Sequence, residues 1–269
     1  MTATALSAAA FGEDPGMWPL PAAHTPAELW LRAVAAGGQG HYGSAQADLS
    51  ALLRQLPAGG LASLALSTRA SFLRQLGGHR AARGWDGRAL ALAGTDGAST
   101  VEPTVDALVG LAADALGVGR LAVSATLLER ADAELARVDV PPARLAIRRA
   151  WVGAELAMAA GDGTRAQASA ERGVELAERA LPALRRHRVK SDVVLAAALC
   201  SAGAIDRARE VADRALTDTA VYGLVPLRWA LACLLSDLGS TTRATHEVVT
   251  IREQCAAEVT RRGGRWSGG

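Results

Sequence analysis

The feature that most constrains this chain is a repeated pattern of helix, glycine turn and helix. Residues 196–216 (AAALCSAGAIDRAREVADRAL) repeat the skeleton of residues 154–174 (AELAMAAGDGTRAQASAERGV), which lie 42 residues earlier. The turn glycines of the two stretches, Gly161 and Gly203, occupy the same position. Self-similarity at such a period is typical of proteins in which similar helical units stack against their neighbours.

Six copies of this pattern can be aligned on an alanine that follows the turn. The aligned alanines are 37, 40, 44, 42 and 36 residues apart, and in every copy but the second we assign the turn to the glycine that stands five residues before the alanine. Glycine accepts the left-handed backbone that closes a helix, so each copy predicts two helices joined by a glycine turn. Asp86 and Thr126 weaken the second and third copies, because they replace an apolar residue. The alanines are Ala45, Ala82, Ala122, Ala166, Ala208 and Ala244, and the glycines are Gly40, Gly117, Gly161, Gly203 and Gly239.

A second regularity involves three tryptophans. Trp30, Trp151 and Trp229 each stand 15 residues before the aligned alanine of their copy. A large side chain on one helix packs well over a small one on the next. We therefore expect these indoles to belong to the core, with a ligand platform as the less favoured alternative.

The composition agrees with a helical solenoid. Hydrophobic residues make up 50% of the 269 residues but aromatic residues only 4%, and alanine, the best helix former, is abundant. Runs with the alternating pattern of strands are scarce. We predict an all-α fold, a right-handed α-solenoid of about six helical hairpins over residues 26–260. Flexible tails are expected over 1–25 and 261–269, and loops at 56–60, 93–100 and 138–142.

Residues 196–216 resemble the tetratricopeptide repeat (TPR). Gly203, Ala208, Ala212 and Ala215 match the turn glycine and the three small or aromatic positions of that repeat. The copies here are longer than the family's unit of about 34 residues, and the leading aromatic stands one residue nearer the alanine, so the chain is TPR-like. The alanine- and arginine-rich composition is typical of a high-GC genome such as that of an actinobacterium.

The resemblance implies a binding scaffold. In TPR proteins the first helices of successive hairpins line a concave groove that holds a peptide or a helix of another protein. Carried over to this chain, those helices begin near Pro26, Leu61, Pro103, Arg144, Val189 and Pro226.

The sequence carries no signature of a common catalytic or cofactor site. Lys190 is the single lysine and follows RRHRV, which excludes a P-loop. The five histidines are scattered, and Cys200, Cys233 and Cys255 form no C-x-x-C pair, so we predict no metal, no cofactor and no catalysis. The longest uncharged stretches, of about 15 residues, are shorter than the roughly 20 of a membrane helix. A cytoplasmic protein with reduced thiols is the expectation.

One region has a contrasting charge. The chain has a formal net charge of +2, yet residues 144–190 hold ten basic and five acidic side chains. Arginine forks bind carboxylates and phosphates, which predicts an acidic peptide or helix as partner, although the same run suits a solvated helix end. The candidate partner-binding residues are Arg148, Arg149, Arg185, Arg186, Arg188 and Lys190.

Two further expectations concern partners. The alternative function is a regulatory or sensory module that binds nucleic acid or a phosphorylated small ligand through these arginines. The low net charge and the lack of aromatic residues within the basic run disfavour nucleic acid. Because the ends of a solenoid expose apolar faces, an end-to-end homodimer is compatible with the pattern.

Overall fold

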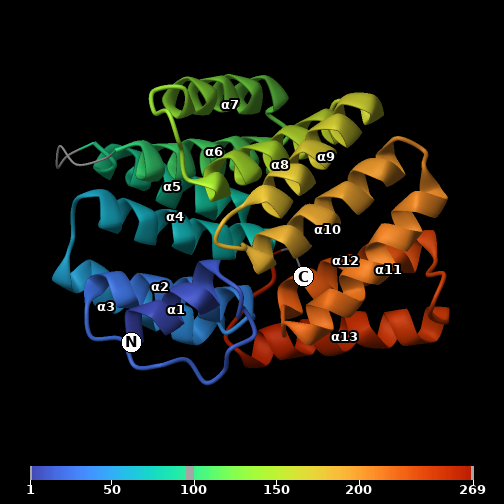
Figure 1. The fold of residues 1–269 in the computed structure, drawn as a ribbon, viewed down its shortest axis with the longest axis horizontal. Coiled ribbons are helices and arrows are strands. Elements are labelled where there is room, and N and C mark those ends of the chain that lie inside the picture. The colour runs from blue at the N-terminus through green and yellow to red at the C-terminus, as the bar shows by residue number, and fades with distance from the viewer. Residues whose placement is uncertain (1, 95–99, 268–269) are drawn as a thin grey trace.

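The computed structural model describes residues 2–94 and 100–267. All regular structure in this part is helical, and after α1 the helices pack as six consecutive pairs (Figure 1). The predicted all-α, TPR-like solenoid is therefore confirmed. Residues 1, 268 and 269 of the expected tails, and 95–99 of the loop predicted at 93–100, lie outside the described residues. The helices are α1 (Thr2–Phe11), α2 (Pro26–Gly38), α3 (Tyr42–Gln55), α4 (Gly60–Gln75), α5 (His79–Leu92), α6 (Val101–Gly117), α7 (Leu121–Leu135), α8 (Ala143–Ala159), α9 (Gly163–Arg179), α10 (Arg185–Ser201), α11 (Ile205–Val221), α12 (Val225–Leu238) and α13 (Thr245–Arg261).

The turns inside the first five pairs are built alike. Each contains a glycine with φ between +76° and +84°, a conformation that side chains with a Cβ rarely adopt. The residue five positions later lies in the second helix and is fully buried against the first. These glycines are Gly40, Gly77, Gly119, Gly161 and Gly203, and the buried residues are Ala45, Ala82, Ser124, Ala166 and Ala208.

The alignment of the third copy was wrong by two residues. Gly117 is the last residue of α6, and Gly119 supplies the left-handed turn. Ala122 is consequently exposed, and Ser124 takes the buried place. The apolar position that Thr126 had seemed to lack is filled by the buried Leu128.

The sixth turn is longer than the others. Gly239 ends α12, but α13 starts only at Thr245, so Ala244 is exposed and the first buried residue of α13 is Val248. Asp213 of α11 holds the extra residues, because its carboxylate accepts hydrogen bonds from the Ser240 hydroxyl at 2.6 Å and the Thr241 amide at 2.7 Å. The aligned alanine is therefore not a packing residue in this copy.

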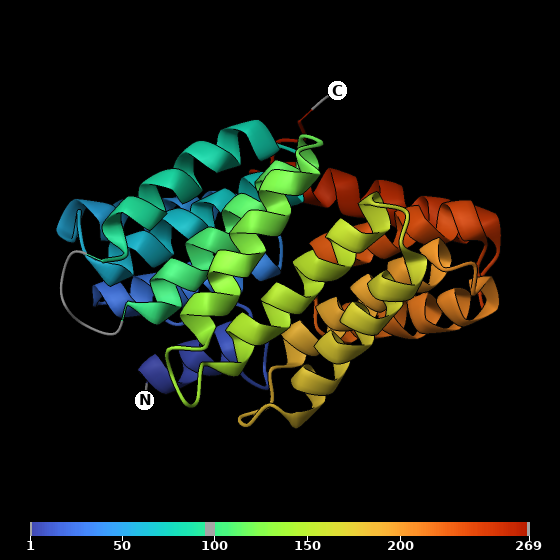
Figure 2. The same cartoon turned by 90° about the horizontal axis from the view of Figure 1, so that it is seen from above.

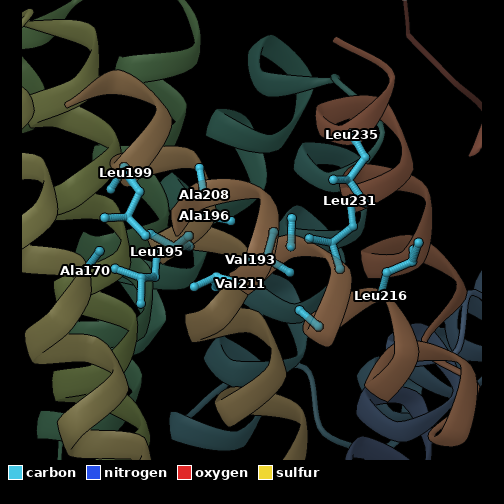
Figure 3. Close-up of a cluster of buried hydrophobic side chains, with 14 of the residues drawn as sticks. Ala170, Val193, Leu195, Ala196, Leu199, Ala208, Val211, Leu216, Leu231 and Leu235 are labelled. Carbon is cyan, nitrogen blue, oxygen red and sulfur yellow. The ribbon is translucent and has the colours of Figure 1, made fainter. Parts of the chain in front are cut away.

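The core lies between the layers of helices. Figure 3 shows leucines such as Leu195 and Leu199 beside small residues such as Ala196 and Ala208 in one cluster of buried side chains. The alanines allow the helix backbones to approach closely, which explains how a chain with few aromatic residues fills its core. Within the described residues, no helix is long and apolar enough to cross a membrane.

The predicted flexible tails differ from the structure, because both ends pack on the repeats. At the N-terminus α1 buries Leu6, Ala9 and Ala10, and the two alanines share a hydrophobic cluster with Val34 and Ala35 of α2. At the C-terminus the indole of Trp266 lies 4.2 Å from that of Trp229, measured between ring centroids. The reason is apolar area: these segments cover faces of the first and last pairs that would otherwise meet water.

The two ends of the solenoid also contact each other, so the row of pairs curves back on itself (Figures 1 and 2). The Gly43 amide donates to the Arg262 carbonyl at 2.8 Å, and the Arg262 guanidinium donates to the Gln39 carbonyl at 2.6 Å. Val259 of α13 shares a hydrophobic cluster with Tyr42 of α3. We call this contact, between α2–α3 and residues 255–267, the seam.

Candidate functional site

A cavity of about 540 Å³ lies inside the curve of the solenoid. Residues of α2, α4, α6, α8, α10 and α12, the first helices of the six pairs, form most of its walls. Phe11 at the end of α1 and His79 at the start of α5 complete them. The starts of these helices lie within four residues of the predicted ones. The sequence therefore identified the helices that line the inner surface.

The structure divides the six predicted partner-binding residues into two groups. Arg148, Arg186 and Lys190 line the cavity. The other three do not: Arg149 pairs with Asp132 on α7, Arg188 pairs with Glu178 on α9, and Arg185 is exposed.

Whether one of these residues lines the cavity depends on its position on its helix, and four of the six lie on α10. The run 185–190 is the first turn and a half of α10, so the interpretation as a solvated C-terminal helix end was wrong. Residues 186 and 190 are four apart and share one face of the helix. That face lines the cavity, whereas residues 185 and 188 point elsewhere.

Arg144 and Arg148 of α8 are held by carboxylates of α6. The Arg144 guanidinium donates to Glu102 at 2.6 Å and to Asp106 at 2.6 Å, and Arg148 donates to the other oxygen of Asp106. Burial opposes ionisation of Asp106, but the two guanidinium groups outweigh it and lower the pKa of this carboxyl. This wall of the cavity is thus a fixed ion-pair network.

Arg186 is held differently. No described carboxylate forms an ion pair with it, its Nη2 donates to the Ala10 carbonyl at a long 3.4 Å, and its Nε is buried without a partner. Burial lowers the pKa of Arg186 to about 10, and the charges of Arg148 and Arg144 add to the effect. A Cβ at Gly38 would lie 2.9 Å from Arg186 Cδ, so this glycine leaves room for the side chain.

His187 lies beside Arg186 and is also unsatisfied. Its side chain is buried, its ring stacks on Trp151 with centroids 5.5 Å apart, and its Nδ1 has no hydrogen-bond partner. Burial and the nearby arginines lower the pKa of His187 well below its ordinary value. The imidazole is therefore neutral at pH 7.

Aromatic side chains form the apolar part of the cavity. The Trp30 indole donates to Thr68 at 3.0 Å, and the Trp151 indole donates to Ser191 at 2.8 Å, so both rings are fixed in orientation. Phe11 lies 5.3 Å from Trp30 between ring centroids. Trp30 and Trp151 line the cavity instead of being wholly within the core as predicted, and Trp229 alone of the three is covered by Trp266.

A second charged cluster closes the side of the cavity formed by α4 and α6. Arg74 donates to Asp86 and to Asp114 at 2.7 Å each, and both carboxylates are fully buried. Burial raises the pKa of Asp86 to about 6, against the effect of Arg74. Sequence reasoning missed this cluster, although Asp86 at an expected apolar position was its signal. In the described residues no three His, Cys, Asp or Glu side chains lie close enough to hold a metal ion.

Comparison with solved structures shows a likeness in fold. The fold is similar to that of NprR in the crystal structure of NprR in complex with its cognate peptide NprX. The match covers 91% of this chain and 73% of that chain, with a TM-score of 0.63 and 11% sequence identity, so the likeness concerns the fold. No protein-family model and no curated protein matches the chain.

Proposed function

We propose that this chain is a non-catalytic binding protein that takes a short peptide of a partner into the cavity between its first helices. The observation that supports this proposal most strongly is the cavity itself, which has fixed aromatic walls and a group of arginines on the inner surface of the solenoid. The fold similarity to NprR, a protein solved with a bound peptide, supports the same function.

The size of the cavity limits the length of the segment that it can hold. An α-helix with its side chains is about 10–12 Å across. A volume of about 540 Å³ therefore accommodates roughly one helical turn. This volume falls within the range of about 300–1,000 Å³ that is usual for small-ligand sites, which suits a peptide segment of a few residues.

The walls are preorganised for binding. Trp30 and Trp151 are held by hydrogen bonds, and Arg144 is held by two carboxylates, so these groups lose little freedom when a ligand arrives. Binding to a site that is already ordered costs less entropy than binding to a mobile one.

The alternative ligands can be ranked from the same geometry. Arg148, Arg186 and Lys190 face an internal cavity, which is unsuited to a duplex whose phosphates lie on its outside. A phosphorylated small ligand fits the volume and the cations, and it is the second candidate. Competition by inorganic phosphate against a bound peptide would support that candidate.

The test is a binding screen with the full chain on an array of immobilised short peptides. Hits are measured in solution through the fluorescence of Trp30 and Trp151, which line the cavity. We expect Ser71→Trp, which puts a large ring into the cavity wall, to weaken binding at least about tenfold.

Ala168→Trp is the matched control, because Ala168 is exposed on α9 outside the cavity. Equal loss of binding in both variants, or unchanged binding in Ser71→Trp, would place the peptide on another surface. Absence of any hit with the wild-type chain would contradict the proposed function.

A further inference from the structure

The charges around the cavity are unevenly matched. Five cationic side chains line it, and four of them have carboxylate partners among the described residues. Arg74 pairs with Asp86 and Asp114, Arg144 with Glu102 and Asp106, Arg148 with Asp106, and Lys190 with Glu155 at 3.8 Å. Arg186 is the one without such a partner in this part of the chain.

Two polar atoms of neighbouring residues that line the cavity are buried without hydrogen bonds. They are Nε of Arg186 and Nδ1 of His187, in the first turn of α10. A buried polar atom without a partner is unfavourable, because it has lost its hydrogen bonds to water and gained none in the protein. Native proteins keep few such atoms, and unexplained ones are often satisfied by a ligand or an ion.

From this geometry, and resting on the proposed function, we infer that the corner formed by Arg186, His187 and Arg148 binds a carboxylate of the peptide. The guanidinium of Arg186 supplies the charge and exchanges its long bond to the Ala10 carbonyl for a bidentate pair. His187 presents its unsatisfied ring edge to the same space.

A carboxylate matches the unpaired charge better than a phosphoryl group. The corner has one unpaired cation, and a carboxylate brings one negative charge. A phosphoryl group brings about −1.5 to −2 at pH 7. The excess negative charge would be repelled by the carboxylates of Asp106 and Glu155, which also line the cavity. These carboxylates are already paired with Arg144, Arg148 and Lys190.

The neighbouring rings define what stands beside the carboxylate. Phe11 lies 6.1 Å from His187, and Trp151 stacks on that histidine at 5.5 Å, both measured between ring centroids. An apolar or aromatic side chain next to the carboxylate would therefore contact these rings. The ligand is a peptide with a carboxylate adjacent to an apolar residue.

Small probes test this subsite without a known peptide. N-acetyl-phenylalanine carries a terminal carboxylate beside a ring, and N-acetyl-phenylalaninamide lacks the charge. N-acetyl-Asp-Phe-amide and N-acetyl-Asn-Phe-amide make the same comparison for a side-chain carboxylate. Affinities are measured by tryptophan fluorescence and isothermal titration calorimetry with wild type, Arg186→Gln, Arg186→Lys and the control Arg188→Gln.

We expect one of the two carboxylate probes to bind wild type and Arg188→Gln roughly 10- to 100-fold more tightly than its amide. The preference should vanish in Arg186→Gln and return in part in Arg186→Lys, and circular dichroism checks that each variant is folded. The pair that shows the preference identifies the source of the carboxylate as the peptide terminus or an acidic side chain.

The inference is overturned if neither pair shows a preference, if the preference survives in Arg186→Gln, or if inorganic phosphate binds more tightly than both carboxylate probes. These outcomes are separate from the peptide screen. If array peptides bind equally well to wild type and to Arg186→Gln, the proposed function is supported and the carboxylate site at Arg186 is contradicted. If the probes bind through Arg186 but no array peptide binds, the carboxylate site is supported and the proposed peptide-binding function is contradicted.

Discussion

At the scale of single residues, Arg144 and Arg186 contrast two ways of keeping a guanidinium inside a protein. Arg144 is saturated by Glu102 and Asp106, so it serves the structure of the wall. Arg186 has one long hydrogen bond to a carbonyl and an unsatisfied Nε, so its burial is a cost that a ligand can relieve.

This contrast predicts opposite effects on stability. Arg186→Met keeps a long side chain and removes an unpaired charge, and we expect it to raise the free energy of unfolding of the ligand-free protein by about 1 kcal/mol. Arg144→Met leaves two carboxylates without their partner and should cost about 3–5 kcal/mol. Denaturant unfolding followed by circular dichroism measures both, and a loss of stability in Arg186→Met would show that its cation is not unpaired.

The buried carboxyl of Asp86 predicts that the stability of the protein depends on pH. Its pKa is raised to about 6, so the folded state binds the proton more tightly than the unfolded state, whose pKa is near 3.8. The contribution of this group to stability therefore falls as pH rises from about 4 to 6. Thermal unfolding at several pH values should show this component in wild type, and Asp86→Asn should lack it. A carbon-13 titration of Asp86 with a midpoint near 4 would contradict the prediction.

At the scale of elements, the glycine turn sets the register of each pair. Gly119→Ala places a Cβ on a residue with φ of +77°, which should cost about 1–2 kcal/mol even though nothing lies within 4 Å of that Cβ. Gly84→Ala lies in the middle of the exposed face of α5, also in open space, and should stabilise by up to about 1 kcal/mol. Equal effects in thermal unfolding would mean that the turn is not at Gly119.

The same element explains how far the sequence could predict the structure. A turn glycine followed five residues later by a small residue is a local signal, and it gave the pairs and the helices that line the cavity. It failed in the third copy because Ser124 replaces alanine and two glycines, Gly117 and Gly119, compete for the turn. Only half of the predicted site residues line the cavity. The sequence did not show that α10 starts at Arg185, so it did not show that Arg186 faces the cavity and Arg188 faces away from it.

At the scale of the whole molecule, no local sequence pattern predicts the seam. It depends on contacts between residues at opposite ends of the chain, such as Arg262 with Gln39. The apolar ends that suggested an end-to-end homodimer meet within one chain in the cluster that contains Leu29 and Val259. The oligomeric state itself stays a prediction for light scattering.

The packing of the C-terminal segment predicts a large effect from one of its side chains. Trp266→Ala removes the ring that covers Trp229, and we expect a loss of about 2–3 kcal/mol, below the full range for a core tryptophan because Trp266 is half-buried. The neighbouring exposed residue offers a control, Arg265→Ala, with an expected change within about 0.5 kcal/mol. Indistinguishable unfolding midpoints for the two variants would mean that the C-terminal segment does not support the fold.

The seam also bears on how the chain folds. In an open row of repeats each unit touches only its neighbours, so unfolding can begin at either end and proceed unit by unit. Here the bond between Arg262 and Gln39 joins residues 223 positions apart, and the first pair cannot fray without breaking contacts with the last. Closing so long a loop is slow and comes late, after the pairs have formed. The ring of repeats should therefore unfold as a single cooperative unit, and the seam would be the last part of it to form.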